Sequence, residues 1–199
     1  KFGRMFPWLP PLSASDDKLF ALAEAMKDPN PGGAEGNNGT IPAGFTYLGQ
    51  FVDHDITLDL TPLDQQEADP LATVNFRSPS LDLDALYGQG PQLAPYMYAR
   101  DADGKIGAKL LIGHAAESDD PAGPHGTRVP RMQNDLPRSS QGRAIIGDER
   151  NDENLLVGQT HLAFLKFHNA VVDMLTAQPG APTGMDLFRE ARRITSWHY

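Results

Sequence analysis

The chain has 199 residues, 40% of them hydrophobic, a length that suits one sizeable domain or part of a larger one. Its net charge of -9 and its pI near 5.0 argue against a nucleic-acid partner, because a phosphate-binding surface needs clustered Lys and Arg. It contains no cysteine, and no apolar run approaches the ~20 residues of a membrane-spanning helix, so neither a disulfide framework nor a membrane span is expected.

The first predicted helix covers residues 16–26. Apolar side chains between Leu19 and Met26 recur at helical spacing, and serine or aspartate residues are available to cap the start. The segment 28–33 that follows is rich in Pro and Gly, which a helix does not tolerate, so the helix is predicted to end there.

The second predicted helix contains the segment 49–55, the most informative stretch of the chain. On a helix, Gln50, Asp53 and His54 lie on one face one turn apart, whereas Asp55 is rotated by about 100°. One short helix could therefore serve two different sites. A histidine between two aspartates is also a common solvated surface feature, so this segment alone does not identify a site.

The remaining elements are predicted to be helices joined by long polar connections, of which residues 89–143 are the longest. A helix from Glu153 to about Thr176 is predicted from its apolar stripe. A last helix begins near Thr183 and is still periodic at Trp197, with no cap visible. We therefore expect the sequence to stop within a helix.

The segment 147–154 reads Gly-Asp-Glu-Arg-Asn-Asp-Glu-Asn and, on a helix, places Arg150 and Glu153 on one face. Together with the face formed by Gln50, Asp53 and His54, it resembles the distal haem site of the animal-type haem peroxidases, the peroxidase-cyclooxygenase superfamily, in a bacterial-looking form. The resemblance extends over nearly the whole chain. It implies a mainly α-helical domain of the haem-peroxidase type, with long loops and little β-structure.

The resemblance also assigns roles in the cleavage of hydrogen peroxide. His54 would take a proton from the peroxide and return it to the departing oxygen, if its imidazole is neutral. Burial and the neighbouring Arg150 cation both disfavour the imidazolium. Arg150 would stabilise negative charge on the departing oxygen, and Gln50 would orient a water or a halide.

The expected cofactor is haem b. Asp53 and Glu153 match the two carboxylates that form ester bonds to haem methyl groups in mammalian members, although they could equally be hydrogen-bonding pocket carboxylates. Asn154 stands where one mammalian member has a methionine that forms a sulfonium link, so no such link is predicted.

A calcium site is predicted in the loop 78–88. Side chains that carry oxygen alternate along it, and Ca²⁺ takes six to eight oxygen ligands. By resemblance to the family, the oxygens would come from Asp55, Ser78, Ser80, Asp82 and Asp84, with main-chain carbonyls serving at the two serines. Where vertebrate members have an aromatic residue, this chain has Ser80. The alternative is a solvated acidic turn.

None of the other histidines resembles the proximal haem ligand. His161 and His168 share a face of the long helix, but the spacing offers no third metal ligand, so structural roles are predicted. We therefore expect residues 1–199 to be the N-terminal, distal-haem part of one incomplete domain. The proximal half would be supplied by a continuation or by a second chain.

The expected activity is that of a haem-dependent peroxidase that reduces hydrogen peroxide and oxidises halides or aromatic and phenolic donors. One alternative is a fatty-acid dioxygenase of the cyclooxygenase-like branch. Another is a catalytically silent, calcium-stabilised interaction domain. The resemblance also favours a secreted or extracytoplasmic location.

Overall fold

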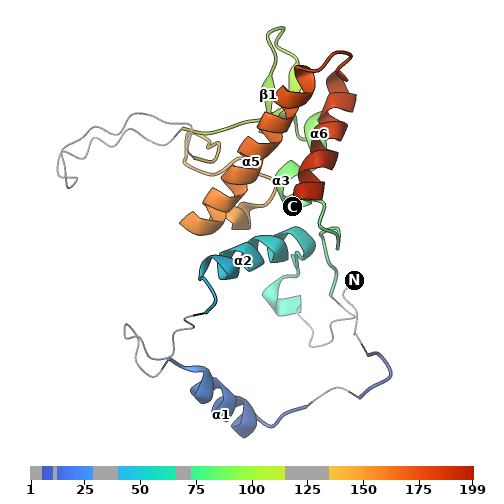
Figure 1. Cartoon of the computed structure of the whole chain (residues 1–199). Helices are drawn as coiled ribbons and strands as arrows, with labels where there is room; N and C mark the ends of the chain where they lie inside the picture. Colours follow the sequence, from blue (N-terminus) through green and yellow to red (C-terminus); the bar gives the residue numbers. More distant parts are fainter. Residues whose placement is uncertain (1–5, 11–12, 29–39, 66–72, 115–134) are drawn as a thin grey trace, which may run out of the picture. The chain divides into compact units, whose positions relative to one another are not determined.

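The computed structural model describes residues 6–10, 13–28, 40–65, 73–114 and 135–199. The chain forms two compact units, one made of residues 1–45 and 59–74 and the other of residues 46–58 and 75–199. The predicted mainly α-helical fold is confirmed, and Figure 1 shows that helices dominate the described part. None of the described helices is both long enough and apolar enough to cross a membrane.

The smaller unit contains the helix α1 (Asp16–Met26) and the 3-10 turn η1 (Leu63–Gln65). The predicted bounds of α1 are confirmed. Two acidic residues in its first turn suit the positive end of the helix dipole. None of its residues is buried.

The larger unit is built on α5 (Leu155–Thr176) and α6 (Gly184–His198), which pack side by side (Figure 1). The third long helix, α2 (Gly44–Ile56), contributes its residues from Thr46 onward. Short elements complete the unit: α3 (Asp84–Tyr87), α4 (Gly90–Leu93), η2 (Pro95–Met97), β1 (Tyr98–Arg100), β2 (Ile106–Leu110) and η3 (Glu149–Asp152). The two strands pair antiparallel, with Tyr98 opposite Leu110.

The core of this unit lies against one stripe of α5. Its buried residues recur every three or four positions: Val157, His161, Leu165, His168, Val172 and Leu175. Both histidines are fully buried, so they lie in the core and not on the helix surface.

The segment before α5 differs from the helix that was expected there. Glu149–Asp152 forms the 3-10 turn η3, and α5 begins at Leu155, not at Glu153. Two side chains set these boundaries. Asp148 accepts a hydrogen bond from the backbone N–H of Arg150, and Asn154 accepts one from Val157 at 3.0 Å.

His168 joins α5 to the hairpin and to α3. Its Nε2 lies 2.9 Å from the carbonyl oxygen of Ala108, which can only accept, so Nε2 carries the proton. Its Nδ1 therefore accepts from the hydroxyl of Tyr87 at 3.0 Å. Burial lowers the pKa of His168 to about 4, and the hydrogen bond to Ala108 only partly opposes this.

We predict that His168 makes the free energy of unfolding fall as the pH drops from about 6.5 to about 4. In that window His168 binds a proton in the unfolded chain but not in the folded state. The stabilisation of the folded state is therefore complete above the window and lost below it. In guanidinium unfolding, the free energy of unfolding should fall across this pH window by up to about 3 kcal/mol less in His168→Gln than in the parent.

The other buried histidines of the described residues, His54 and His161, are present in both proteins and so cancel from the comparison. Curves of equal slope for the parent and the variant would contradict the assignment of a neutral, buried His168.

Candidate active site and metal site

The buried face of α2 places the first site residues. Phe51, His54 and Asp55 are buried at i, i+3 and i+4. Phe51 stacks on Phe164 of α5 with ring centroids 5.2 Å apart. His54 and Asp55 lie beside this anchor and meet different partners, as the sequence predicted for a helix that serves two sites.

His54 begins a buried series of three hydrogen-bonded side chains. Its Nδ1 lies 2.8 Å from Oδ1 of Asn151, and Nδ2 of Asn151 lies 2.9 Å from Nδ1 of His161. Asn151 and His161 are fully buried, and His54 is nearly so. Nδ1 of His54 is thus occupied, and Nε2 remains available for a reactant.

Gln50 and Glu153 meet although 103 positions separate them. The amide nitrogen of Gln50 donates a hydrogen bond to Glu153, and its oxygen accepts one from Asn154 at 3.2 Å. The two motifs that were recognised in the sequence are therefore in direct contact. Asp53, by contrast, lies on the exposed side of α2, and Glu153 is also exposed.

Arg150 is hydrogen-bonded to the C-terminal end of α2. One of its terminal nitrogens, Nη2, donates to the carbonyl oxygens of His54 at 3.0 Å and Thr57 at 2.7 Å. The same nitrogen donates to Oδ2 of Asp148 at 2.7 Å, and Nε donates to Oδ1 at 3.0 Å. A cation at the negative end of a helix dipole is favourable. The hydrogen bonds to His54 and Thr57 hold Arg150 against the helix turn that carries His54.

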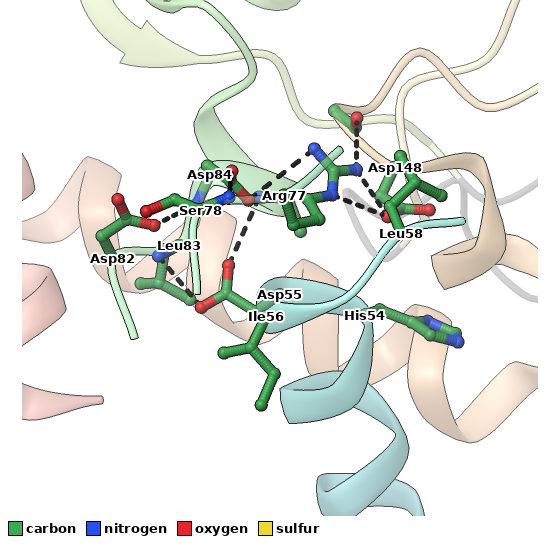
Figure 2. A network of polar contacts seen from close by, with 12 residues as sticks. His54, Asp55, Ile56, Leu58, Arg77, Ser78, Asp82, Leu83, Asp84 and Asp148 are labelled. Carbon is green, nitrogen blue, oxygen red and sulfur yellow. Dashed lines mark hydrogen bonds and ion pairs between the residues drawn. The ribbon is translucent and has the colours of Figure 1, made fainter. Parts of the chain in front are cut away.

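Asp148 is held by a second arginine that sequence analysis did not single out, Arg77 (Figure 2). Arg77 donates to Oδ2 of Asp148 through Nε at 3.2 Å and through Nη2 at 2.5 Å. Burial by itself would raise the pKa of Asp148, but the hydrogen bonds from Arg150 and Arg77 outweigh it and lower the pKa. Arg77 also lies 3.7 Å from Asp84.

The predicted metal site is partly assembled. Asp55, Asp82 and Asp84 each present an oxygen, and these oxygens all lie within 4.8 Å of one another. Ser78 reaches Asp84 through its backbone N–H at 3.2 Å. Ser80 is exposed, and no hydrogen bond in the described part of the chain joins it to the three carboxylates.

The backbone around Leu83 brings the carboxylates together. Leu83 adopts the left-handed conformation, with φ 59° and ψ 36°, although its side chain is fully buried. This turn directs the N–H group of Leu83 to the carboxylate of Asp55 at 3.1 Å (Figure 2). The N–H group of Ala85 donates to the same carboxylate at 3.4 Å. Asp82 and Asp84 flank Leu83 in the sequence, and the backbone N–H of Asp84 donates to Oδ1 of Asp82 at 3.3 Å.

The electrostatics of this cluster suit a cation. Burial raises the pKa of Asp55 to about 6, and the charges of Asp84 and Asp82 add to this effect against the two backbone hydrogen bonds. Burial also raises the pKa of Asp84, whose Oδ1 is buried without a hydrogen bond within the described residues. A bound divalent cation would neutralise these crowded carboxylates.

Comparison with known proteins identifies the family. The model of the animal haem peroxidase family matches residues 61–198, so the chain belongs to that family. Members of its superfamily are haem-dependent oxidoreductases, and the family binds haem. The matched range includes Arg150 and Glu153 and begins after His54.

The solved structures that resemble the chain agree with this fold. Fatty acid alpha-dioxygenase from Oryza sativa shares 20% sequence identity at a TM-score of 0.51, and the match covers 77% of this chain and 26% of that one. The corresponding protein from Arabidopsis thaliana shares 22% identity at a TM-score of 0.50, with coverages of 77% and 25%. The chain thus spans about a quarter of their length. No curated protein matches it.

We predict that Asp148→Asn destabilises the fold by about 3 kcal/mol, because it leaves two arginines around a neutral group where a buried charge had been. Chemical unfolding measures the change. Asp152→Asn is the matched control, because Asp152 pairs with Arg138 at a half-exposed site and should cost less than about 1 kcal/mol. Equal losses in the two variants would contradict the role given to Asp148.

Proposed function

We propose that residues 1–199 form the N-terminal, distal-haem part of one peroxidase domain that reduces hydrogen peroxide. The observation that carries this proposal is the arrangement of His54 and Arg150. The imidazole is held through Nδ1 and leaves Nε2 available, while the guanidinium bonds to the carbonyl oxygen of the same residue. Family membership and the coverage of about a quarter of the dioxygenase chains support the incomplete domain. The remaining C-terminal part, as a continuation or a second chain, would supply the proximal haem ligand.

The donor set suits the distal side of a haem by its chemistry: α2 supplies an imidazole and an amide, and η3 supplies a guanidinium. When bound, haem b supplies the iron at which the peroxide oxygen is reduced. Nε2 of His54 accepts the proton that peroxide loses and returns it to the oxygen that leaves as water. Arg150 stabilises the negative charge on that oxygen before the proton arrives.

The balance of the reaction requires two electrons from a reducing substrate. Hydrogen peroxide takes up two electrons and two protons and gives two molecules of water. We propose halides or aromatic and phenolic donors as the source of the electrons. Gln50, whose amide is already oriented by Glu153 and Asn154, would order a water or a halide beside His54.

Asp53 and Glu153, the two carboxylates of the motifs, have different environments. Glu153 accepts a hydrogen bond from Gln50, which suits a positioning role, whereas Asp53 is exposed on α2. Both are exposed in this chain, and we propose them as the carboxylates available for ester bonds to haem methyl groups.

Calcium is the second proposed cofactor. Asp55, Asp82 and Asp84 would supply carboxylate oxygens, and Ser78 and Ser80 would contribute main-chain carbonyls. The support is the buried Asp55, whose pKa is raised, and the buried oxygen of Asp84 that has no hydrogen bond in the described ranges. Because Asp55 follows His54 directly, the ion would steady the helix end that carries the catalytic histidine.

A second candidate activity is favoured by the structural comparison. The two solved structures named above are fatty acid alpha-dioxygenases, so this chain could belong to an enzyme that oxygenates a fatty acid. Oxygen uptake with a fatty acid, measured against oxidation of a phenolic donor with peroxide, distinguishes the two enzymes. A haem absorption band that does not respond to peroxide would instead indicate a silent interaction domain.

We predict that His54→Ala in the complete, haem-loaded protein slows peroxide cleavage by about 10²–10⁴-fold, the usual contribution of a positioned proton-transfer group. Stopped-flow absorption after mixing with peroxide measures this rate. His114→Ala is the control, because His114 is exposed and should leave the rate unchanged. A His54→Ala rate close to that of the parent would exclude His54 as the base.

We also predict that calcium affinity falls as the pH drops through about 6, because the ion must then displace a proton from Asp55. Titration calorimetry on either side of that pH measures the effect. Asp82→Ala should lower the calcium content, whereas Asp186→Ala, on the exposed side of α6, should not. Unchanged calcium in Asp82→Ala would overturn the site.

A further inference from the structure

We propose that Asn151 is a positioning residue for His54, which holds the imidazole in the tautomer that leaves Nε2 without a proton. His161 in turn holds Asn151. This inference rests on the proposed peroxidase function, and it adds a residue that no motif identified.

Three elements meet in this chain of contacts. His54 comes from α2, Asn151 from η3 and His161 from α5. The two links are 2.8 and 2.9 Å long, and the amide of Asn151 is completely shielded from solvent. A buried hydrogen bond of this kind has no water to compete with it, so it can control which ring nitrogen carries the proton.

The two polar atoms of the Asn151 amide determine which groups donate and which accept in this series of hydrogen bonds. Oδ1 only accepts and Nδ2 only donates, so the orientation in this structure requires a proton on Nδ1 of His54. Nδ1 of His161 must accept from Nδ2, which needs a neutral ring. Burial lowers the pKa of His161 to about 3, more than the opposing charges of Asp148 and Asp152 raise it, so this ring stays neutral over the working range.

The backbone of Asn151 is also fixed. Its N–H donates to the carbonyl oxygen of Asp148 at 3.1 Å, within the same turn that positions Arg150. The side-chain amide is fully buried and is hydrogen-bonded at both ends, so it has little freedom to move away from His54.

The tautomer matters because the general base must accept a proton at the nitrogen that faces the reactant. A neutral imidazole without a directing partner carries its proton mainly on Nε2, where it would block that step. An acceptor at Nδ1 reverses this preference. The contribution of Asn151 is therefore chemical as well as structural.

The environment of His161 allows a conservative replacement of Asn151. Its Nε2 is buried and has no hydrogen-bond partner among the residues that the structure describes. His161 can thus change tautomer without losing a hydrogen bond. In Asn151→Asp, the carboxylate can accept from Nδ1 of both histidines, so this variant should keep the proton of His54 on Nδ1.

The test is the protonation state of the His54 nitrogens, observed by ¹⁵N NMR of the complete protein with labelled histidine. The diamagnetic form is used, either without haem or with reduced haem that binds carbon monoxide. The signals of His54 are identified by their loss in His54→Gln. At alkaline pH, the parent and Asn151→Asp should show a protonated Nδ1 and an unprotonated Nε2, whereas Asn151→Leu should shift toward a protonated Nε2.

Asn169→Leu is the matched control, because it also removes a side-chain amide, one on α5 that bonds to the backbone of Leu110. It should leave the His54 signals unchanged. In the same proteins, Asn151→Leu should lower the rate of peroxide cleavage by about 10-fold or more, while Asn151→Asp retains most of that rate at alkaline pH.

A parent protein with the proton of His54 on Nε2 would overturn the inference without any variant, even if Asn151→Leu failed to fold. Equal His54 signals in the parent and in a folded Asn151→Leu would also overturn it. These spectra do not depend on turnover. A normal peroxide rate in His54→Ala would refute the proposed function even where the tautomer assignment holds.

Discussion

The rotation of α2 about its own axis is the constraint on which both candidate sites depend. Phe51 sets this rotation because its ring is completely buried between Phe164 and Tyr199, at centroid distances of 5.2 and 5.9 Å. Once that ring is in place, helical geometry directs the next residues on the same face to fixed partners. His54 meets η3, and Asp55 meets the loop before α3. An apolar anchor thus aligns two polar sites.

Asp148 connects the two sites at a second point. One of its oxygens accepts from Arg150, the other accepts from both Arg150 and Arg77, and Arg77 extends toward Asp84. Each guanidinium is planar and rigid, so Arg77 and Arg150 hold the carboxylate of Asp148 from two directions. The acidic cluster and Arg150 are therefore linked through one buried carboxylate as well as through α2.

The sequence predicted the long helices because their stabilisation is periodic. The stripe from Val157 to Leu175 and the motif around His54 can both be recognised locally. It also predicted the contact between the two motifs by family resemblance, and Gln50 and Glu153 do meet. The helix that was expected from Glu153 begins at Leu155, and Arg150 lies in a separate 3-10 turn, because Asp148 and Asn154 each cap a separate element.

Other features had no local signal. Arg77 acts on a carboxylate 71 positions away, and no spacing rule reaches that far. Asn151 lies between two charged residues in the sequence and was not singled out, and contacts with residues of α2 and α5 accompany its burial. The exposure of Asp53 also depends on packing, because periodicity placed it on the same face as His54.

The left-handed backbone at Leu83 has a consequence for how this loop can vary. A leucine in this conformation costs roughly 1–2 kcal/mol relative to an ordinary one, yet its side chain is among the largest that are fully buried. Glycine would relieve the backbone and leave a void in the core, whereas other large residues would fill the space and keep the strain. Neither kind of replacement improves the loop alone, so natural variation at this position should require a compensating change in the neighbouring core.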